Sequence, residues 1–158
     1  MYKFGRNSRR IQETLHPDLI ALTNRVIKDI DISIIGGYRS PEEQNRLYHM
    51  GMTKLKGGDS KHNTDPSRAV DIAPYIRSEG IPWKRHEQFY YMSGIVFAHW
   101  KQMTREGVPK EKGTLLRWGG NWGNYARHDV KDNDPVMGKG TQSFMDLPHF
   151  ELCSPRLK

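Results

Sequence analysis

The stretch DISIIGGYRSPEEQ, residues 31–44, changes within a few positions from a strand pattern to a helix pattern. Its first five residues alternate and are rich in β-branched side chains, which predicts a strand that ends at the Gly-Gly pair. An N-cap serine, a first-position proline and a capping-box glutamate predict the start of a helix at Ser40, Pro41 and Glu43. We therefore expect Arg39 at a fixed junction between a strand and a helix.

The rest of the chain mixes the same two kinds of element without a fixed period. Apolar residues at helical spacing predict helices over 17–30 and 84–105, besides the one that runs from Pro41 to about Gly51. Short apolar or β-branched runs predict strands over 69–73, 115–118 and 150–152. Because no linker interrupts the chain, we expect residues 1–158 to form one domain. The predicted fold class is α+β, a single compact domain with a small, largely antiparallel sheet flanked by helices.

The composition restricts both the chemistry and the partners. Cys153 is the single cysteine, which excludes a disulfide framework and a thiolate zinc cluster, so any metal must be held by histidines and carboxylates. The net charge of +7 favours polyanionic partners, whether nucleic acid, an anionic membrane surface or a cell-wall polymer. The basic N-terminus is not followed by an apolar run, and no stretch approaches ~20 apolar residues, so we expect no signal peptide and no transmembrane segment.

Two of the seven histidines have an acidic companion in an ordered context. His62 precedes Asp71, which lies on an apolar strand where an unpaired carboxylate would be costly, and His149 follows Asp146 by three positions. Two imidazoles and one carboxylate are a zinc ligand set that leaves a fourth position open for water. We therefore predict that His62, Asp71 and His149 bind a metal ion, with Asp146 as a spare acid beside it.

Four motifs resemble, in their order, those of the zinc D,D-carboxypeptidase and L-alanyl-D-glutamate endopeptidase (VanY-like) family, and above all its phage endolysin branch. They are GYRSPEEQ at 37–44, SKH with AVD between 60 and 71, RWGGNW at 117–122 and DLPHFEL at 146–152. The resemblance implies a hedgehog/D,D-peptidase-like fold with Zn²⁺ held by His62, Asp71 and His149. It also implies the other roles: Asp146 as general base, Arg39 as the cation that steadies the oxyanion, and Ser60, Gln44 and Trp122 as substrate-binding residues.

The function implied by this resemblance is that of a zinc-dependent peptidoglycan peptidase, an endolysin that cuts the stem peptide between L-Ala and D-Glu for bacterial lysis. A D-Ala-D-Ala carboxypeptidase shares the motifs and stays open as an alternative. A phage lysin without a signal would be made in the host cytoplasm and act in the cell wall or periplasm after membrane permeabilisation. We expect a monomer whose positive charge allows contact with the anionic cell envelope.

Three other functions use the same residue types. A basic metal-dependent nuclease would suit the charge, but His62 and His149 are 87 residues apart and no nucleic-acid-binding signature is present, so we expect no nucleic-acid partner. An iron(II) oxygenase has the same ligand types, but keeps its first histidine and carboxylate much closer together than His62 and Asp71. A non-catalytic wall-binding module would not need Asp146 and Arg39 beside a full ligand set. The peptidase is therefore the preferred interpretation.

Two loops differ from the pattern of the resembled family. His62 and Asp71 are nine positions apart, which we interpret as a two-residue loop insertion, and which makes Asp65 an alternative ligand. The loop over 123–143 contains Asp132-Asn133-Asp134, a run that raises a Ca²⁺ site as an alternative to a plain solvated loop. The missing Gly and distal Glu of an EF-hand favour the solvated loop, which we expect to act as a lid over the substrate groove.

Parity along the last strand makes a separate prediction. His149 and Glu151 point to one face of that strand, while Phe150 and Leu152 point to the other, into the core. Glu151 is therefore either an outer carboxylate that orients a ligating imidazole or an exposed strand residue, and the sequence does not decide between the two.

Overall fold

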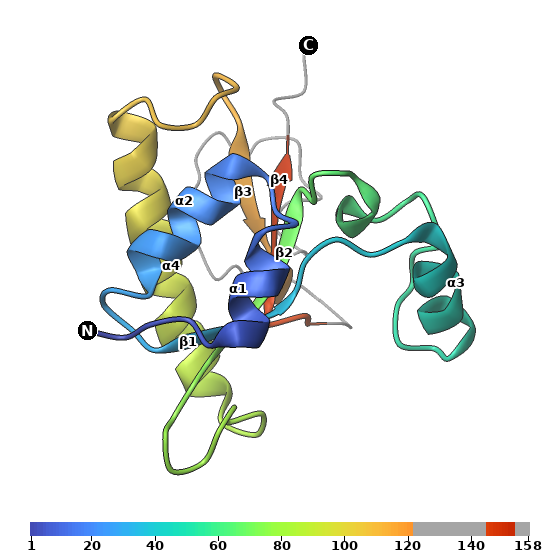
Figure 1. Ribbon diagram of the computed structural model, residues 1–158, viewed down its shortest axis with the longest axis horizontal. Helices are drawn as coiled ribbons and strands as arrows, with labels where there is room; N and C mark the ends of the chain where they lie inside the picture. The colour runs from blue at the N-terminus through green and yellow to red at the C-terminus, as the bar shows by residue number, and fades with distance from the viewer. Residues whose placement is uncertain (122–144, 154–158) are drawn as a thin grey trace.

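The computed structural model describes residues 1–121 and 145–153. Its helices are α1 (Arg6–Gln12), α2 (Pro17–Val26), α3 (Pro41–His49) and α4 (His86–Arg105), with 3-10 helices η1 (Lys61–Asn63) and η2 (Gly119–Asn121). Its strands are β1 (Ile32–Gly36), β2 (Ala69–Pro74), β3 (Leu115–Trp118) and β4 (His149–Cys153). Figure 1 shows α1, α2 and α4 gathered around the sheet, with α3 set apart from them. None of the helices in the described ranges has the length and apolar character that crossing a bilayer requires.

The four described strands form one antiparallel sheet in the order β1-β2-β4-β3, which confirms the predicted α+β class. The two central strands are β2 and β4, and their register sets Asp71 directly opposite His149. On the other side of β4, Arg117 of β3 lies opposite Glu151. The charged and ligating residues of three neighbouring strands therefore lie side by side.

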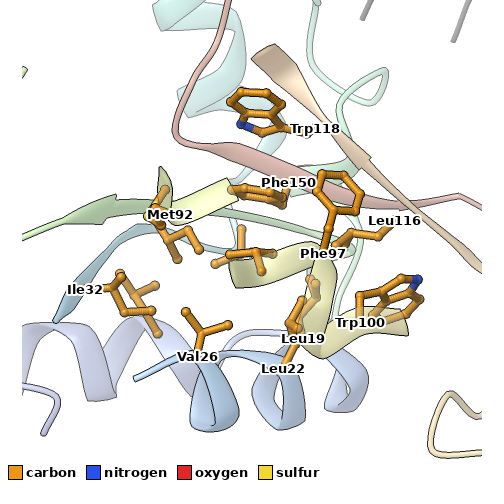
Figure 2. Close-up of a cluster of buried hydrophobic side chains, with 14 of the residues drawn as sticks. Leu19, Leu22, Val26, Ile32, Met92, Phe97, Trp100, Leu116, Trp118 and Phe150 are labelled. Atoms are coloured by element: carbon orange, nitrogen blue, oxygen red, sulfur yellow. The ribbon is translucent and has the colours of Figure 1, made fainter. Parts of the chain in front are cut away.

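The hydrophobic core fills the opposite face of the sheet (Figure 2). Val70 of β2 is fully buried there, and so are Phe150 and Leu152 of β4, as the parity predicted for the last strand requires. Helix α4 covers this face with its apolar stripe, all at most 1% exposed: Phe89, Met92, Val96, Trp100 and Met103. Helix α2 packs against α4 in turn. Since side chains alternate along a strand, the residues between the core positions of β2 and β4 are directed to the other face.

Several element boundaries differ from the sequence-based expectations. The pattern does not predict α1, because Ser8 is the one buried residue of this helix and its sequence shows no apolar stripe. The Ser8 hydroxyl joins α1 to β1 by accepting from the Ile34 N–H at 3.0 Å. Helix α2 ends at Val26, before the expected end at residue 30, because the N–H groups of Lys28 and Asp29 bond to carbonyls three residues back, at Arg25 and Val26, instead of four. His62 lies on η1, where a loop was expected.

Candidate active site

A cavity of about 560 Å³ opens on the polar face of the sheet. The sheet contributes Asp71, Arg117, His149 and Glu151 to its lining, and Asp146 lies just before β4. The facing side is an outer wall formed by Leu47 of α3 and residues 52–55. The polar and charged groups of the sheet therefore share the cavity with a wall of mixed character, in which Leu47, Met52 and Leu55 are apolar and Thr53 and Lys54 are polar.

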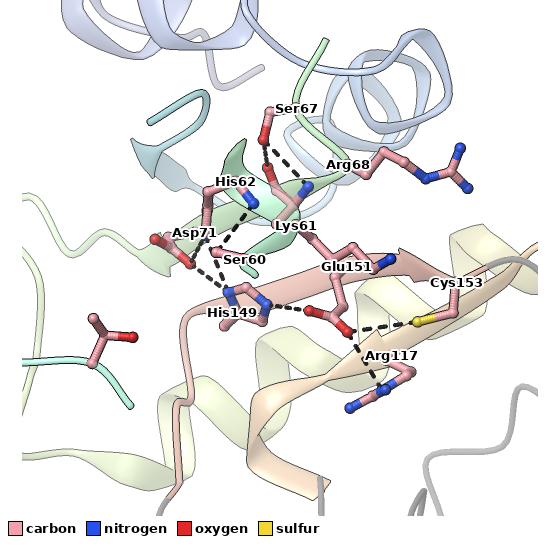
Figure 3. Close-up of polar contacts among 12 residues, drawn as sticks. Ser60, Lys61, His62, Ser67, Arg68, Asp71, Arg117, His149, Glu151 and Cys153 are labelled. Atoms are coloured by element: carbon pink, nitrogen blue, oxygen red, sulfur yellow. Dashed lines mark hydrogen bonds and ion pairs between the residues drawn. The ribbon is translucent and has the colours of Figure 1, made fainter. Parts of the chain in front are cut away.

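Three ligand atoms converge on the floor of this cavity (Figure 3). His62 Nε2 lies 3.2 Å from His149 Nδ1 and 3.2 Å from Asp71 Oδ1, and His149 Nδ1 lies 3.0 Å from the same oxygen. The bonds of a tetrahedral zinc site, about 2.0 Å long, set neighbouring ligand atoms about 3.3 Å apart. The spacing of the His-Asp-His centre, as we call these three residues, therefore fits three corners of such a site.

The outer ring nitrogens of both histidines are engaged by acceptors. His62 Nδ1 donates to the Gly37 carbonyl at 2.6 Å, and His149 Nε2 donates to the Glu151 carboxylate at 2.9 Å. A carbonyl and a carboxylate only accept, so these hydrogen bonds assign the protons to the outer nitrogens. Each ring then directs a lone pair at Asp71 Oδ1. Three acceptors that face one another repel unless a cation lies between them, so the donor set fits a metal ion.

The charge state of the centre also favours a bound cation. Burial opposes ionisation of Asp71, but the two histidines hold the pKa of its carboxyl well below the usual value. Burial also disfavours the imidazolium form of His149, yet the hydrogen bonds to Asp71 and Glu151 raise its pKa to about 10. The centre therefore attracts positive charge, and in the absence of a metal ion it holds a proton.

Local structure explains how the two ends of the long loop converge. The Ser60 hydroxyl accepts from the His62 N–H at 3.2 Å and caps η1, which fixes the first candidate ligand. Ser67 then joins the loop to the α1–α2 connection, because its N–H donates to the Thr14 carbonyl at 2.9 Å. Asp65 is exposed on this loop and lies outside the group of ligand atoms, which contains Asp71 instead.

Asp146 lies at the edge of the same cavity and is held by η2. Its N–H donates to the Gly119 carbonyl at 3.2 Å, and a Cβ at Gly119 would overlap the Asp146 carbonyl oxygen and Cβ. Burial, together with the negative charge of Asp71, raises the pKa of the Asp146 carboxyl. Gly119 thus permits the close approach, and the surroundings make Asp146 a stronger base than an exposed aspartate.

Arg39 approaches the centre from the side of α3. Its Nη2 lies 3.7 Å from Asp71 Oδ2, and its Nη1 donates to Gln44 Oε1 at 2.9 Å. Gln44 is 0% exposed and does not line the cavity; its amide donates to the Leu55 carbonyl at 2.8 Å. The geometry therefore places Gln44 behind Arg39, where it orients the guanidinium, instead of in direct reach of substrate.

Six of the eight predicted site residues line the cavity together: Arg39, Ser60, His62, Asp71, Asp146 and His149. Gln44 lies behind them, and Trp122 falls outside the described residues. The same holds for the predicted Ca²⁺ site at Asp132–Asp134 and for the predicted lid over 123–143, which both stay predictions.

Glu151 resolves the alternative that parity left open. It is 9% exposed and hydrogen-bonded to His149, which places it as the outer partner of a candidate ligand imidazole. Burial would raise the pKa of its carboxyl, but His149 and the charge of Arg117 lower it.

Sequence reasoning did not single out Lys61 or Arg117, which also line the cavity. Both residues could have been found from the sequence, because Lys61 adjoins the predicted ligand His62 and Arg117 begins the RWGGNW motif.

A small α+β domain with an open cavity, a candidate metal centre, a basic carboxylate and a guanidinium is built as a hydrolytic enzyme. The comparisons with known proteins agree and are more specific. The family model described as phage L-alanyl-D-glutamate peptidase matches residues 1–153, so the chain belongs to this peptidase family.

Two curated relatives and one solved structure are similar to the chain. The L-alanyl-D-glutamate peptidase of Escherichia phage T5 is 32% identical over 154 residues, which cover 96% of this chain and 98% of the relative. The peptidoglycan L-alanyl-D-glutamate endopeptidase CwlK of Bacillus subtilis is 28% identical over 132 residues, 79% of this chain and 62% of CwlK. The Serratia marcescens L-Ala D-Glu endopeptidase ChiX shares the fold, with a TM-score of 0.64 and 19% identity over 96% of this chain and 90% of ChiX.

Proposed function

We propose that this enzyme is a zinc-dependent endopeptidase that hydrolyses the amide bond between L-Ala and D-Glu in the stem peptide of peptidoglycan. The observation that carries the proposal is the convergence of the His-Asp-His centre, with three acceptor atoms 3.0–3.2 Å apart, beside Asp146 in an open cavity. The bond is the one named for the phage T5 and Bacillus subtilis relatives.

Zn²⁺ suits the centre because two imidazoles and one carboxylate are its usual ligands in hydrolases that keep a fourth position open. When bound there, the ion supplies Lewis acidity, which lowers the pKa of a coordinated water and polarises a carbonyl. His62 and His149 would each hold it by the lone pair that their outer hydrogen bonds leave inside.

The remaining steps belong to the side chains around the centre. Asp146, whose pKa is raised, accepts the proton of the attacking water and later delivers it to the leaving amine of D-Glu. Arg39, held by Gln44, presents positive charge to the oxygen on which negative charge develops. Ser60, 7% exposed, accepts from the His62 N–H and lines the cavity, so its hydroxyl proton is directed to the substrate backbone.

We also propose where the enzyme is made and where it acts. It is made in the host cytoplasm and reaches the cell wall after a separate factor permeabilises the membrane. The net charge of +7 then favours retention on the anionic envelope.

Digestion of purified peptidoglycan tests the function. Mass spectrometry of the products should show new D-Glu amino termini, and a chelator or the Asp146→Asn substitution should abolish them. The exposed Arg77, which does not line the cavity, provides a matched folding control as Arg77→Gln. Release of D-Ala without D-Glu termini would instead identify a carboxypeptidase, and cleavage that survives the chelator would refute the role of the metal.

A further inference from the structure

One end of the cavity carries two cations around a single carboxylate. Arg117 of β3 and Lys61 of η1 line this end together with Glu151 of β4, and we call the three residues the cationic end. Arg117 and Glu151 are register partners on neighbouring strands, and Arg117 Nε lies 3.6 Å from Glu151 Oε1 (Figure 3). The sheet therefore holds the guanidinium in a defined position beside the ligand His149.

Both oxygens of the Glu151 carboxylate already accept hydrogen bonds from other side chains of the protein. Glu151 Oε2 accepts from His149 at 2.9 Å, and Oε1 accepts from the Cys153 thiol at 3.5 Å. Burial and Glu151 raise the pKa of that thiol, whereas the charges of Arg117 and Lys61 lower it. Among the described residues, the charged side chains of this end are therefore one carboxylate and two cations, Arg117 and Lys61, next to the centre.

The substrate of the proposed function has a matching negative group. D-Glu is joined to the next stem residue through its γ-carboxyl, so its α-carboxyl group lies two covalent bonds from the nitrogen that leaves. When the L-Ala carbonyl is at the His-Asp-His centre, this α-carboxyl group must contact the cavity lining next to it. Arg39 is bound by Gln44 and Asp71 on the side of α3, whereas Arg117 is placed beside His149.

We propose that Arg117, assisted by Lys61, is the specificity residue that binds the α-carboxylate of D-Glu, so that the enzyme prefers stem peptides with a free carboxylate over those amidated to D-isoglutamine. The inference rests on the proposed function. A guanidinium matches a carboxylate in geometry and charge, and amidation removes the charge while it preserves the shape. The preference belongs to this one contact and leaves the chemistry of the centre unchanged.

Two synthetic peptides test the inference on the zinc-loaded enzyme: N-acetyl-L-Ala-γ-D-Glu-L-Lys and the same peptide with γ-D-isoglutamine. We expect kcat/KM to be at least tenfold higher for the free acid. Arg117→Gln should lower kcat/KM for the free acid by a much larger factor than for the amidated peptide, so that most of the preference is lost. Lys61→Gln should reduce the preference by a smaller factor, and Arg77→Gln, which removes an equal charge away from the cavity, should retain it.

A structural role of Arg117 through Glu151 would give another pattern. Arg117→Gln would then lower kcat/KM equally for both peptides and reduce the bound zinc, and this result would overturn the inference. Equal cleavage of the two peptides by the unaltered enzyme would also overturn it. If the unaltered enzyme cuts neither peptide but releases D-Ala from peptidoglycan, the proposed function is wrong and the specificity inference falls with it.

Discussion

Removal of the metal ion should leave a tightly held proton on His149. Its pKa rises from the ordinary 6.5 to about 10, because the hydrogen bonds to Asp71 and Glu151 outweigh the burial that disfavours the charge. At about 1.4 kcal/mol per pKa unit, the shift corresponds to on the order of 5 kcal/mol of preference for the protonated form. This contribution to the stability of the metal-free protein is fully present below pH 6.5 and is lost as the pH rises through about 10.

The assay is a titration of chelator-treated protein from pH 6 to 11, with the ¹⁵N shifts of the His149 ring as the readout. Urea unfolding at both ends of this range should show a loss of stability that His149→Gln lacks. Glu151→Gln keeps an acceptor for Nε2 but removes its charge, so it should lower the pKa of His149 by at least ~1 unit. An imidazole pKa at or below 6.5 in the metal-free protein, or one that Glu151→Gln leaves unchanged, would refute the reasoning.

Three further predictions concern the reaction and the ligands. Asp146→Asn should keep the fold and the bound zinc, measured by elemental analysis, and lower kcat by about 10²–10⁴-fold, the usual contribution of a general base. Gly119→Ala should displace Asp146, because the new Cβ overlaps its backbone, and should lower kcat while zinc is retained; unchanged kcat would contradict the packing described. Asp71→Ala should lose zinc in an equilibrium dialysis assay, whereas the exposed Asp65→Ala should retain it, and the reverse order would reassign the ligand.

The sequence predicted the sheet and the centre where local rules apply. Alternation along the last strand separated His149 and Glu151 from Phe150, because successive strand residues face opposite sides. The cap at Ser40 is formed as expected, since its hydroxyl accepts from the Glu43 N–H, although the Glu43 carboxylate pairs with Arg46 instead of completing the capping box. Such features depend on neighbours within a few positions, which the sequence displays directly.

Features that depend on distant contacts could not be predicted in the same way. Whether Asp71 or Asp65 completes the centre depends on the strand register and on the anchoring of Ser67 to another part of the chain. Helix α1 is joined to β1 by the bond of Ser8 and packs against the core through the partly buried Ile11, neither of which forms a recognisable apolar stripe in the sequence. The pairing of Arg117 with Glu151 likewise follows from the order of strands in the sheet, which no local pattern specifies.

The buried amide of Gln44 connects two parts of the site that perform different tasks. One end of this amide holds the Arg39 guanidinium, and the other end holds the Leu55 carbonyl in the outer wall. A displacement of the outer wall by a bound peptide would therefore also move the Arg39 guanidinium, the cation for which we propose a role in catalysis. We therefore expect a stem peptide that fits the outer wall poorly to bind and yet react slowly, with the penalty in kcat and not only in KM.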